Sequence, residues 1–393
     1  MQKTENWGEY NHALATRLIN DLETTKENKE IALSWDKAQF AGGAKPSTRA
    51  NKMQALRQLL AWADGKNIKE FDADTLINFR QYLETTKYSI KGSKPRKYSK
   101  QSTKNRLSTL KQFYGWLGKP EAMQWFKAKR ELHGRLTAQE ILSQKEILRL
   151  ITAANSKRDK ALISALWETG ARAGEFLPLK IKDLHIDGNT ISLTVDGKTG
   201  KRQAFLVASV PAMLQWLEEH PQKNNPEAML WEKGTHKNGS RLTNNALRAM
   251  LLATAKRAGI TKPCFAHALR HSRATFAAKS GQNEMVMREI FGWSRISEMP
   301  SIYISLCGKD LKDAALELAG VQKAEEAEPI LKPKVCVRCG TVAPIDGMVC
   351  QRCFFPLNAE GAKVQEEKEV SRMEAMINAA LDARESKATT KAP

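Results

Sequence analysis

Residues 267–303 read HALRHSRATFAAKSGQNEMVMREIFGWSRISEMPSIY. The stretch opens with two histidines and an arginine within five residues, continues to a Gly-Trp pair and ends on a tyrosine. His267 and Arg270 are three residues apart, so on a helix both side chains project from one face. Arginine suits phosphate oxygens, histidine exchanges protons near neutral pH, and a phenol becomes a nucleophile once its proton is accepted. Whether these residues form an active site depends on segments upstream.

The bulk composition is that of a globular protein long enough for two or three domains. The chain has 393 residues, of which 41% are hydrophobic and 27% charged. No apolar run approaches the ~20 residues that a membrane helix needs. The N-terminus, MQKTENWGEY, lacks the apolar core of a signal peptide. We therefore expect a cytoplasmic protein without a membrane partner.

The formal net charge of +20 points to an acidic partner. Residues 359–393 hold nearly equal numbers of basic and acidic side chains, so the excess belongs to the rest of the chain. Nucleic acid is the partner that such an excess most often serves, because each neutralised phosphate releases a counterion. A merely basic enzyme is the alternative.

Residues 1–130 are predicted to form a helical domain with no clear strand. Apolar residues recur at helical spacing in 51–63, 74–83 and 102–117. Between the last two segments, residues 87–111 hold nine basic side chains and no acidic one. A charge run is often only a solvated face, but this one joins a loop to an apolar-faced helix and favours contact with the DNA backbone. The candidate DNA-binding residues are Lys94, Arg96, Lys97, Lys100, Lys104 and Arg106.

A second domain is predicted from about residue 131, after the charged hinge at 127–140. Helices are expected over 141–154 and 159–169, and Gly170 ends the second of them just before Arg172 and Glu175. Residues 189–207 alternate as a β-hairpin, with Ile191, Leu193 and Val195 on one strand and Phe205 and Val207 on the other. The hairpin turn carries two lysines, Lys198 and Lys201.

Brought together, these residues could handle a phosphodiester. Two arginines would bind its free oxygens, a lysine would protonate a leaving oxygen, and a tyrosine would attack phosphorus. Phosphoryl transfer needs positioning and charge neutralisation above all. Each signal alone is weak, and a structural reading of each residue competes with the functional one.

Residues from about 50 to 320 resemble the tyrosine recombinases of the phage integrase family. The resemblance is carried by TGARAGEFLPLKIKDL around Arg172, GKTGKR around Lys198, HALRHSRATF from His267, FGW at Trp293, and the run ending in Tyr303. It implies a mainly α, multidomain fold: a helical SAM-like core-binding domain followed by a mixed α+β catalytic domain with a small β-hairpin or sheet.

The resemblance also implies roles for six catalytic residues. Arg172 and Arg270 would bind the scissile phosphate, Lys198 would protonate the 5′ oxygen, with Lys201 as a rival, and His267 would handle the tyrosine proton. Trp293, where histidine is commoner, would donate to a phosphate oxygen. Tyr303 would form a 3′-phosphotyrosyl link, so that rejoining needs neither ATP nor a metal. His271 is interpreted as structural packing.

The same resemblance implies double-stranded DNA carrying a specific attachment site as substrate, and a homotetramer in the synaptic complex on DNA. The segment after Tyr303, ISLCGKDLKDAALELAGV, resembles the archaeal branch of the family. Its predicted helix would either dock on a neighbouring protomer or close its own domain.

Four cysteines form two CxxC pairs: Cys336 with Cys339, and Cys350 with Cys353. In a chain without export signals this pattern predicts a structural zinc site, since four thiolates leave no open position for catalysis. We expect a small zinc ribbon that contacts either DNA or a protein partner.

The expected domains are 1–130 for DNA binding, 131–322 for catalysis, 323–333 as a linker, 334–358 as the ribbon and 359–393 as a charged helical tail. Apolar residues in this tail recur at spacings of three, four and three, which favours a short coiled coil. They are Val370, Met373, Ile377 and Ala380.

The leading hypothesis is the integrase of an archaeal mobile element. The alternatives are a chromosome-dimer resolvase of the same family and a catalytically inactive zinc-ribbon DNA-binding regulator. A type IB topoisomerase shares the tyrosine chemistry but resembles the chain less.

Overall fold

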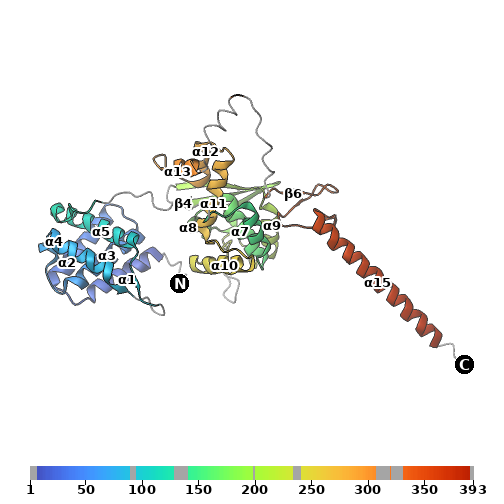
Figure 1. Ribbon diagram of the computed structural model, residues 1–393, viewed down its shortest axis with the longest axis horizontal. Helices are drawn as coiled ribbons and strands as arrows, with labels where there is room; N and C mark the ends of the chain where they lie inside the picture. Colours follow the sequence, from blue (N-terminus) through green and yellow to red (C-terminus); the bar gives the residue numbers. More distant parts are fainter. Residues whose placement is uncertain are drawn as a thin grey trace. The chain divides into compact units, whose positions relative to one another are not determined.

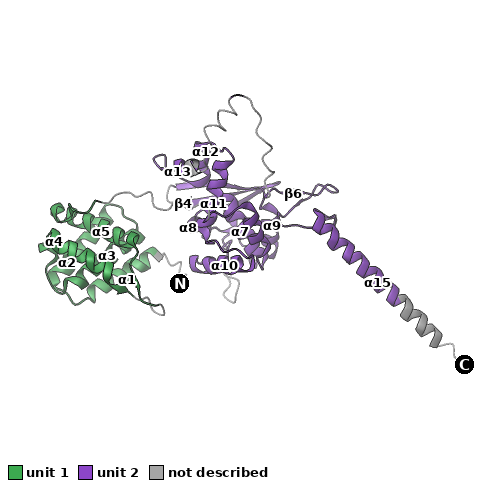
Figure 2. Cartoon of the chain, viewed as in Figure 1, with its two compact units in different colours: residues 1–133 green, residues 134–393 purple. Residues whose placement is uncertain are grey.

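The computed structural model describes residues 7–88, 94–127, 140–197, 200–232, 240–306, 319 and 331–389. Helices predominate, and the strands form small sheets (Figure 1). The chain folds as two compact units, residues 1–133 and 134–393 (Figure 2). Within the described residues, no helix combines the length and apolarity needed to cross a membrane.

The first unit is a helical domain built around a single apolar core. Its helices are α1 (Trp7–Asn20), α2 (Lys26–Ala41), α3 (Pro46–Ala63), α4 (Ala73–Thr85) and α5 (Lys100–Trp116), with short 3-10 helices η1 (Ile68–Glu70) and η2 (Pro120–Met123). Trp35 is fully buried and meets Phe113 edge-on, with ring centroids 5.3 Å apart. The three predicted amphipathic segments correspond to α3, α4 and α5. The predicted faces of α3 and α5 are confirmed, whereas on α4 Ile77 and Tyr82 are 41% and 38% exposed and do not belong to the buried face.

The prediction that this region has no strand is wrong. Strands β1 (Lys87–Tyr88) and β2 (Arg96–Lys97) form a short antiparallel pair. Tyr88 stacks on Tyr98 at 4.2 Å beside the pair. Strands of two residues contain no alternation to read, because period 2 needs several residues to show itself.

The second unit contains the catalytic candidates. It comprises α6 (Gln144–Thr152), α7 (Lys157–Thr169), α8 (Ala173–Phe176), η4 (Ile181–Asp183), β3 (Leu184–Asp187), β4 (Thr190–Gly197), β5 (Gly200–Leu206), α9 (Val210–Glu219), α10 (Asn244–Arg257), α11 (Ala266–Lys279), α12 (Glu284–Phe291) and α13 (Met299–Leu306). Helix α7 is buried at all four predicted core positions, Ala161, Leu162, Ala165 and Leu166. It therefore packs at the centre of the unit.

The predicted hairpin is present, extended by β3 into a three-stranded antiparallel sheet. Ile191, Leu193 and Val195 of β4 are fully buried, as expected. On β5 the expected face is wrong: Phe205 is 63% exposed, while Leu206 is buried. The register explains the error, because Leu206 pairs with Ile191 and Phe205 with Ser192, and residues paired across strands share a face.

The cysteine-rich segment packs on the catalytic part of the second unit. Strands β6 (Lys334–Val335) and β7 (Val342–Ala343) pair within it. Leu331 and Ile345 join the large apolar core, and Lys160 of α7 forms an ion pair with Asp346 at 2.5 Å.

The tail forms helix α15 (Ala359–Thr389), so the predicted helix is present. Val370, Met373 and Ile377 are 50%, 58% and 59% exposed. The coiled coil itself stays a prediction.

Candidate active site

Arg172 is presented by a tight turn between α7 and α8. Gly170 ends α7 with a left-handed backbone (φ 56°), and a Cβ atom there would lie 2.4 Å from the Phe291 ring. Glycine is therefore required both by the backbone and by the approach of α12. The turn leaves the Arg172 side chain 37% exposed, with both terminal nitrogens 3.4 Å from the Gly292 carbonyl.

Arg270 on α11 is held much more deeply. Its side chain is 4% exposed and donates to the Gly170 carbonyl at 2.8 Å and the Phe291 carbonyl at 2.6 Å. The guanidinium also lies over the Phe291 and Trp293 rings, 5.4 and 5.7 Å from their centroids. Arg270 thus joins the turn before Arg172 to the end of α12, which fixes the two arginines relative to each other.

The buried carboxylate of Glu175 supports this cationic cluster. It accepts from the Arg172 backbone N–H and from Arg202 of β5, both at 2.8 Å, and lies 4.0 Å from Arg270. A Cβ atom on Gly197 would come within 2.5 Å of the same carboxylate. Sequence reasoning placed Glu175 near Arg172 but missed Arg202, which no local spacing indicates.

Tyr303 lies on α13 and is 3% exposed. Its ring stacks on Trp293 with centroids 5.5 Å apart and planes 8° from parallel. Its hydroxyl is hydrogen-bonded to Nδ1 of His271. The interpretation of His271 as packing alone therefore misses a direct contact. The sequence signal was available, because His267 and His271 are four residues apart and share a helix face.

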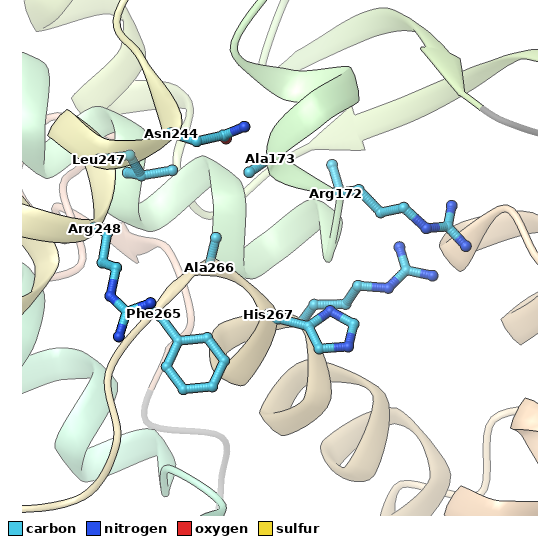
Figure 3. A pocket seen from close by; sticks show the side chains of 10 residues that line it. Arg172, Ala173, Asn244, Leu247, Arg248, Phe265, Ala266 and His267 are labelled. Atoms are coloured by element: carbon cyan, nitrogen blue, oxygen red, sulfur yellow. The ribbon is translucent and has the colours of Figure 1, made fainter. Parts of the chain in front are cut away.

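The two histidines differ in position. His267 is exposed and lines a cavity of about 310 Å³ together with Arg172, Arg270 and Arg248. Figure 3 shows the Arg172 and His267 side chains extending in the same direction, while Arg248 lies on the other side of Phe265. The His267 and His271 rings meet edge to face at 4.1 Å.

Burial and the neighbouring cations shift the pKa values of the site. Partial desolvation by the surrounding protein atoms, followed by the charges of Arg270 and Arg172, lowers the pKa of His267 even though its ring lines the open cavity. Burial, followed by His267 and Arg270, lowers the pKa of His271 to about 4. Burial lowers the pKa of Arg270 to about 9 and raises that of Tyr303 well above its usual range. At neutral pH the site therefore holds neutral histidines, a protonated tyrosine and a charged Arg270.

Five of the six predicted catalytic residues meet in this one region of the second unit. They are Arg172, His267, Arg270, Trp293 and Tyr303. Lys198, the sixth, lies outside the described residues. Its rival Lys201 is exposed on β5, opposite Asp196. The assembled groups are two arginines, a residue type suited to phosphate oxygens, in the same region as a hydrogen-bonded phenol.

The predicted DNA-binding residues lie in the first unit along β2 and α5. Lys94, Arg96, Lys97 and Lys100 are exposed, and Lys104 lies on α5. Arg96 lies over the Tyr88 ring at 5.4 Å and Arg106 over the Tyr98 ring at 4.2 Å. Stacked tyrosines with arginines over them hold two of these cations in defined positions.

The four cysteines converge as their spacing predicted. The sulfur atoms of Cys336, Cys339, Cys350 and Cys353 all lie within 4.8 Å of one another. The sulfur atoms of Cys336 and Cys353 are 3.5 Å apart, and those of Cys339 and Cys350 are 3.6 Å apart. Ligands about 2.3 Å from a tetrahedral zinc stand roughly 3.8 Å apart, so the cluster is close to that geometry.

Comparisons with known proteins agree with the site. Residues 140–307 match the profile of the phage integrase family. Tyrosine recombinase XerD of Bifidobacterium longum (strain NCC 2705) is 25% identical over 261 residues, 62% of this chain and 81% of its own length. Tyrosine recombinase XerC of Xanthomonas campestris pv. campestris (strain B100) is 27% identical over 284 residues, 69% of this chain and 83% of its own length.

Two solved structures share the fold at lower identity. The Tn1549 transposon integrase in complex with transposon right end DNA is 17% identical with a TM-score of 0.55, covering 74% of this chain and 99% of that chain. The XerH site-specific recombinase bound to palindromic difH substrate, a post-cleavage complex, is 18% identical with a TM-score of 0.53, covering 81% and 98%. Residues 140–307 therefore form a phage integrase family domain, and with the recombinase relatives this identifies a tyrosine-type site-specific DNA recombinase.

Proposed function

We propose that this recombinase cleaves and rejoins DNA through a 3′-phosphotyrosyl intermediate formed on Tyr303. The observation that carries the proposal is a buried, hydrogen-bonded phenol stacked on Trp293, whose ring lies 5.7 Å from the Arg270 guanidinium and next to Gly292, the residue that Arg172 contacts. A diester held by two arginines has its charge neutralised, and the phenol is the neighbouring nucleophile.

In the proposed step, Arg172 and Arg270 bind the two non-bridging oxygens. Tyr303 attacks phosphorus as its proton leaves toward the α11 histidines, and the 5′ oxygen departs with a proton from Lys198. Trp293, stacked on Tyr303, donates its indole N–H to a phosphate oxygen. The ester bond conserves the energy of the cleaved diester, so rejoining requires neither ATP nor a metal.

The substrate is duplex DNA with a specific attachment site, engaged by a homotetramer in the synaptic complex. The basic surface of the first unit contacts the backbone through Lys94, Arg96, Lys97, Lys100, Lys104 and Arg106. Phosphate contacts of this kind confer affinity with little sequence choice. We also propose a cytoplasmic, DNA-associated location, because the proposed substrate is DNA.

The biological role that we propose is integration or excision of an archaeal mobile element. A cysteine module added to the two-domain core supports it, because resolution of chromosome dimers needs only that core. Chromosome-dimer resolution is the second candidate, favoured by the relatives named XerC and XerD. The two roles differ in where the site lies: beside the gene as direct repeats for an element, or at a single chromosomal locus for a resolvase.

A covalent-trapping experiment tests the chemistry. The full-length protein selects its site from a random-sequence duplex library, and the selected site is rebuilt with a nick that lets the cleaved 5′ fragment diffuse away. Wild type should form an adduct that is stable in detergent, and Tyr303→Phe should form none. Tyr82→Phe, an exposed tyrosine of α4, is the matched control and should behave as wild type.

An adduct in Tyr303→Phe would refute the assignment of the nucleophile. A wild-type protein that binds the selected site without forming an adduct would instead support a DNA-binding regulator that has lost catalysis. Locating the selected site in the source genome then separates the two recombinase roles.

The four cysteines would hold one structural Zn²⁺ in the second unit. Zinc binding there would stabilise a segment too small to have a core of its own. Metal analysis should find one equivalent per chain in the wild type and none in a Cys336→Ser/Cys350→Ser variant. A full equivalent in the double variant would refute the site.

A further inference from the structure

We propose that His271 is a catalytic residue that hydrogen-bonds the Tyr303 hydroxyl and receives its proton as the tyrosine attacks DNA. The inference rests on the proposed function and assigns to His271 the proton transfer that the family resemblance gives to His267. The contact that carries it is the hydrogen bond between His271 Nδ1 and the Tyr303 oxygen.

The surroundings orient the phenol toward this acceptor. Trp293 stacks on the Tyr303 ring with planes 8° apart, which sets the plane of the ring. The bond to His271 sets the position of the oxygen at the end of that ring. His267 instead lines the cavity beside Arg172, where the diester would bind. The two histidines therefore serve different atoms of one reaction.

The charge state of His271 suits an acceptor. Burial, His267 and Arg270 lower its pKa to about 4, so the imidazole is neutral at physiological pH and one ring nitrogen carries a lone pair. We assign the proton of that neutral ring to Nε2, which leaves Nδ1 free to accept. A diester bound by Arg172 and Arg270 brings negative charge to the same cations. Its arrival would raise the pKa of His271 and strengthen it as a base.

The step balances without another reactant. The Tyr303 O–H bond breaks and its proton moves to His271 Nδ1, while the phenolate oxygen forms the bond to phosphorus. The bond from phosphorus to the 5′ oxygen breaks, and that oxygen takes the proton of Lys198. In rejoining, a 5′-hydroxyl gives its proton back to Lys198 and forms the bond to phosphorus. The bond from phosphorus to the Tyr303 oxygen breaks, and that oxygen takes back the proton held by His271.

Single-turnover adduct formation on the selected nicked site tests the assignment. His271→Ala should slow the reaction by about 100-fold or more, the usual effect of losing a general base. His271→Asn keeps a hydrogen-bond acceptor near the Nδ1 position but takes no proton, so it should stay at least about 10-fold below wild type. His220→Asn is the matched control, because His220 is a buried histidine that bonds the Met229 carbonyl away from the site.

A substrate with sulfur in place of the bridging 5′ oxygen separates base from acid. A thiolate leaves without being protonated, so this substrate should rescue a Lys198→Ala/Lys201→Ala variant. It should not rescue His271→Ala, whose defect lies in the nucleophile. Rates measured against pH should fall on acidification in wild type and stay flat in His271→Asn. The groups facing the ring from α11 and α13, His267, Arg270 and Tyr303, are unchanged in both.

Thermal unfolding and affinity for the site show whether each variant is folded, and the near-isosteric His271→Asn keeps the test usable if the alanine variant unfolds. Either of two results would overturn the proposal: full activity of a folded His271→Asn variant, or a His271→Ala rate within about threefold of wild type. Adducts formed by wild type would in that case still support the proposed function. If wild type forms no adduct on either substrate, the proposed function itself fails.

Discussion

Neutralising the Glu175 carboxylate should destabilise the second unit much more than neutralising an exposed carboxylate with equally close partners. Glu175 is 3% exposed and accepts from the Arg172 backbone and from Arg202, both at 2.8 Å. Arg172 Nη1 and Arg270 Nη1 lie 3.7 and 4.0 Å away. In Glu175→Gln the side chain keeps its shape, but three guanidinium groups lose their counterion.

Breaking a buried ion pair on one side costs about 3–5 kcal/mol, because the remaining charge is left uncompensated. Glutamine can still accept from the Arg172 N–H, so we expect the lower end, about 3 kcal/mol. For a domain of this size that lowers the unfolding midpoint by roughly 6–12 °C. The same loss should weaken DNA binding, since Arg172 would no longer be held in place.

Glu227→Gln is the matched control. Glu227 contacts Lys180 and Lys182 at 2.7 and 2.6 Å, and hydrogen bonds from these lysines lower its pKa to about 2. Its side chain is 58% exposed, so water screens the pair and its loss should leave the midpoint nearly unchanged. Differential scanning calorimetry of both variants is the assay. Equal midpoints for the two variants would refute the argument that burial makes Glu175 the support of the arginine cluster.

Three further predictions follow from individual contacts. Gly170→Ala should lower the free energy of unfolding by about 3 kcal/mol, because the left-handed backbone and the nearby Phe291 ring leave no room for a Cβ atom. An unchanged midpoint of thermal unfolding would contradict this close approach. His271 has a folded-state pKa of about 4 against 6.5 ordinarily. At about 1.4 kcal/mol per pKa unit this shift corresponds to about 3 kcal/mol, which its partial exposure to solvent reduces to on the order of 2 kcal/mol. This contribution is complete above pH 6.5 and is lost as pH falls toward 4, so His271→Asn should flatten that slope in pH-dependent melts. Lys97→Gln/Lys100→Gln should reduce the slope of log affinity against log salt for duplex DNA by about 2, and an unchanged slope would exclude phosphate contact at both.

Much of the fold could be predicted from the sequence, because helical periodicity is a local property. The faces of α3, α5 and α7 follow from apolar residues three and four apart. The strands were harder to predict. Strands β1 and β2 are too short to show alternation, and the buried face of β5 depends on its pairing with β4. Register is a relation between two segments, so neither segment contains it alone.

What the sequence by itself determined is the set of chemical groups and their order: Arg172, the HALRH segment, the Gly-Trp pair, Tyr303 and the paired cysteines. These signals are short and local, and residue type and spacing carry them. The tertiary structure alone decided which groups meet. Contacts of Glu175 with Arg202, and of His271 with Tyr303, join residues 27 and 32 positions apart. The packing of the β4–β5 hairpin on α8 and of α13 on α11 creates these contacts. Spacing along the chain carries no record of that packing.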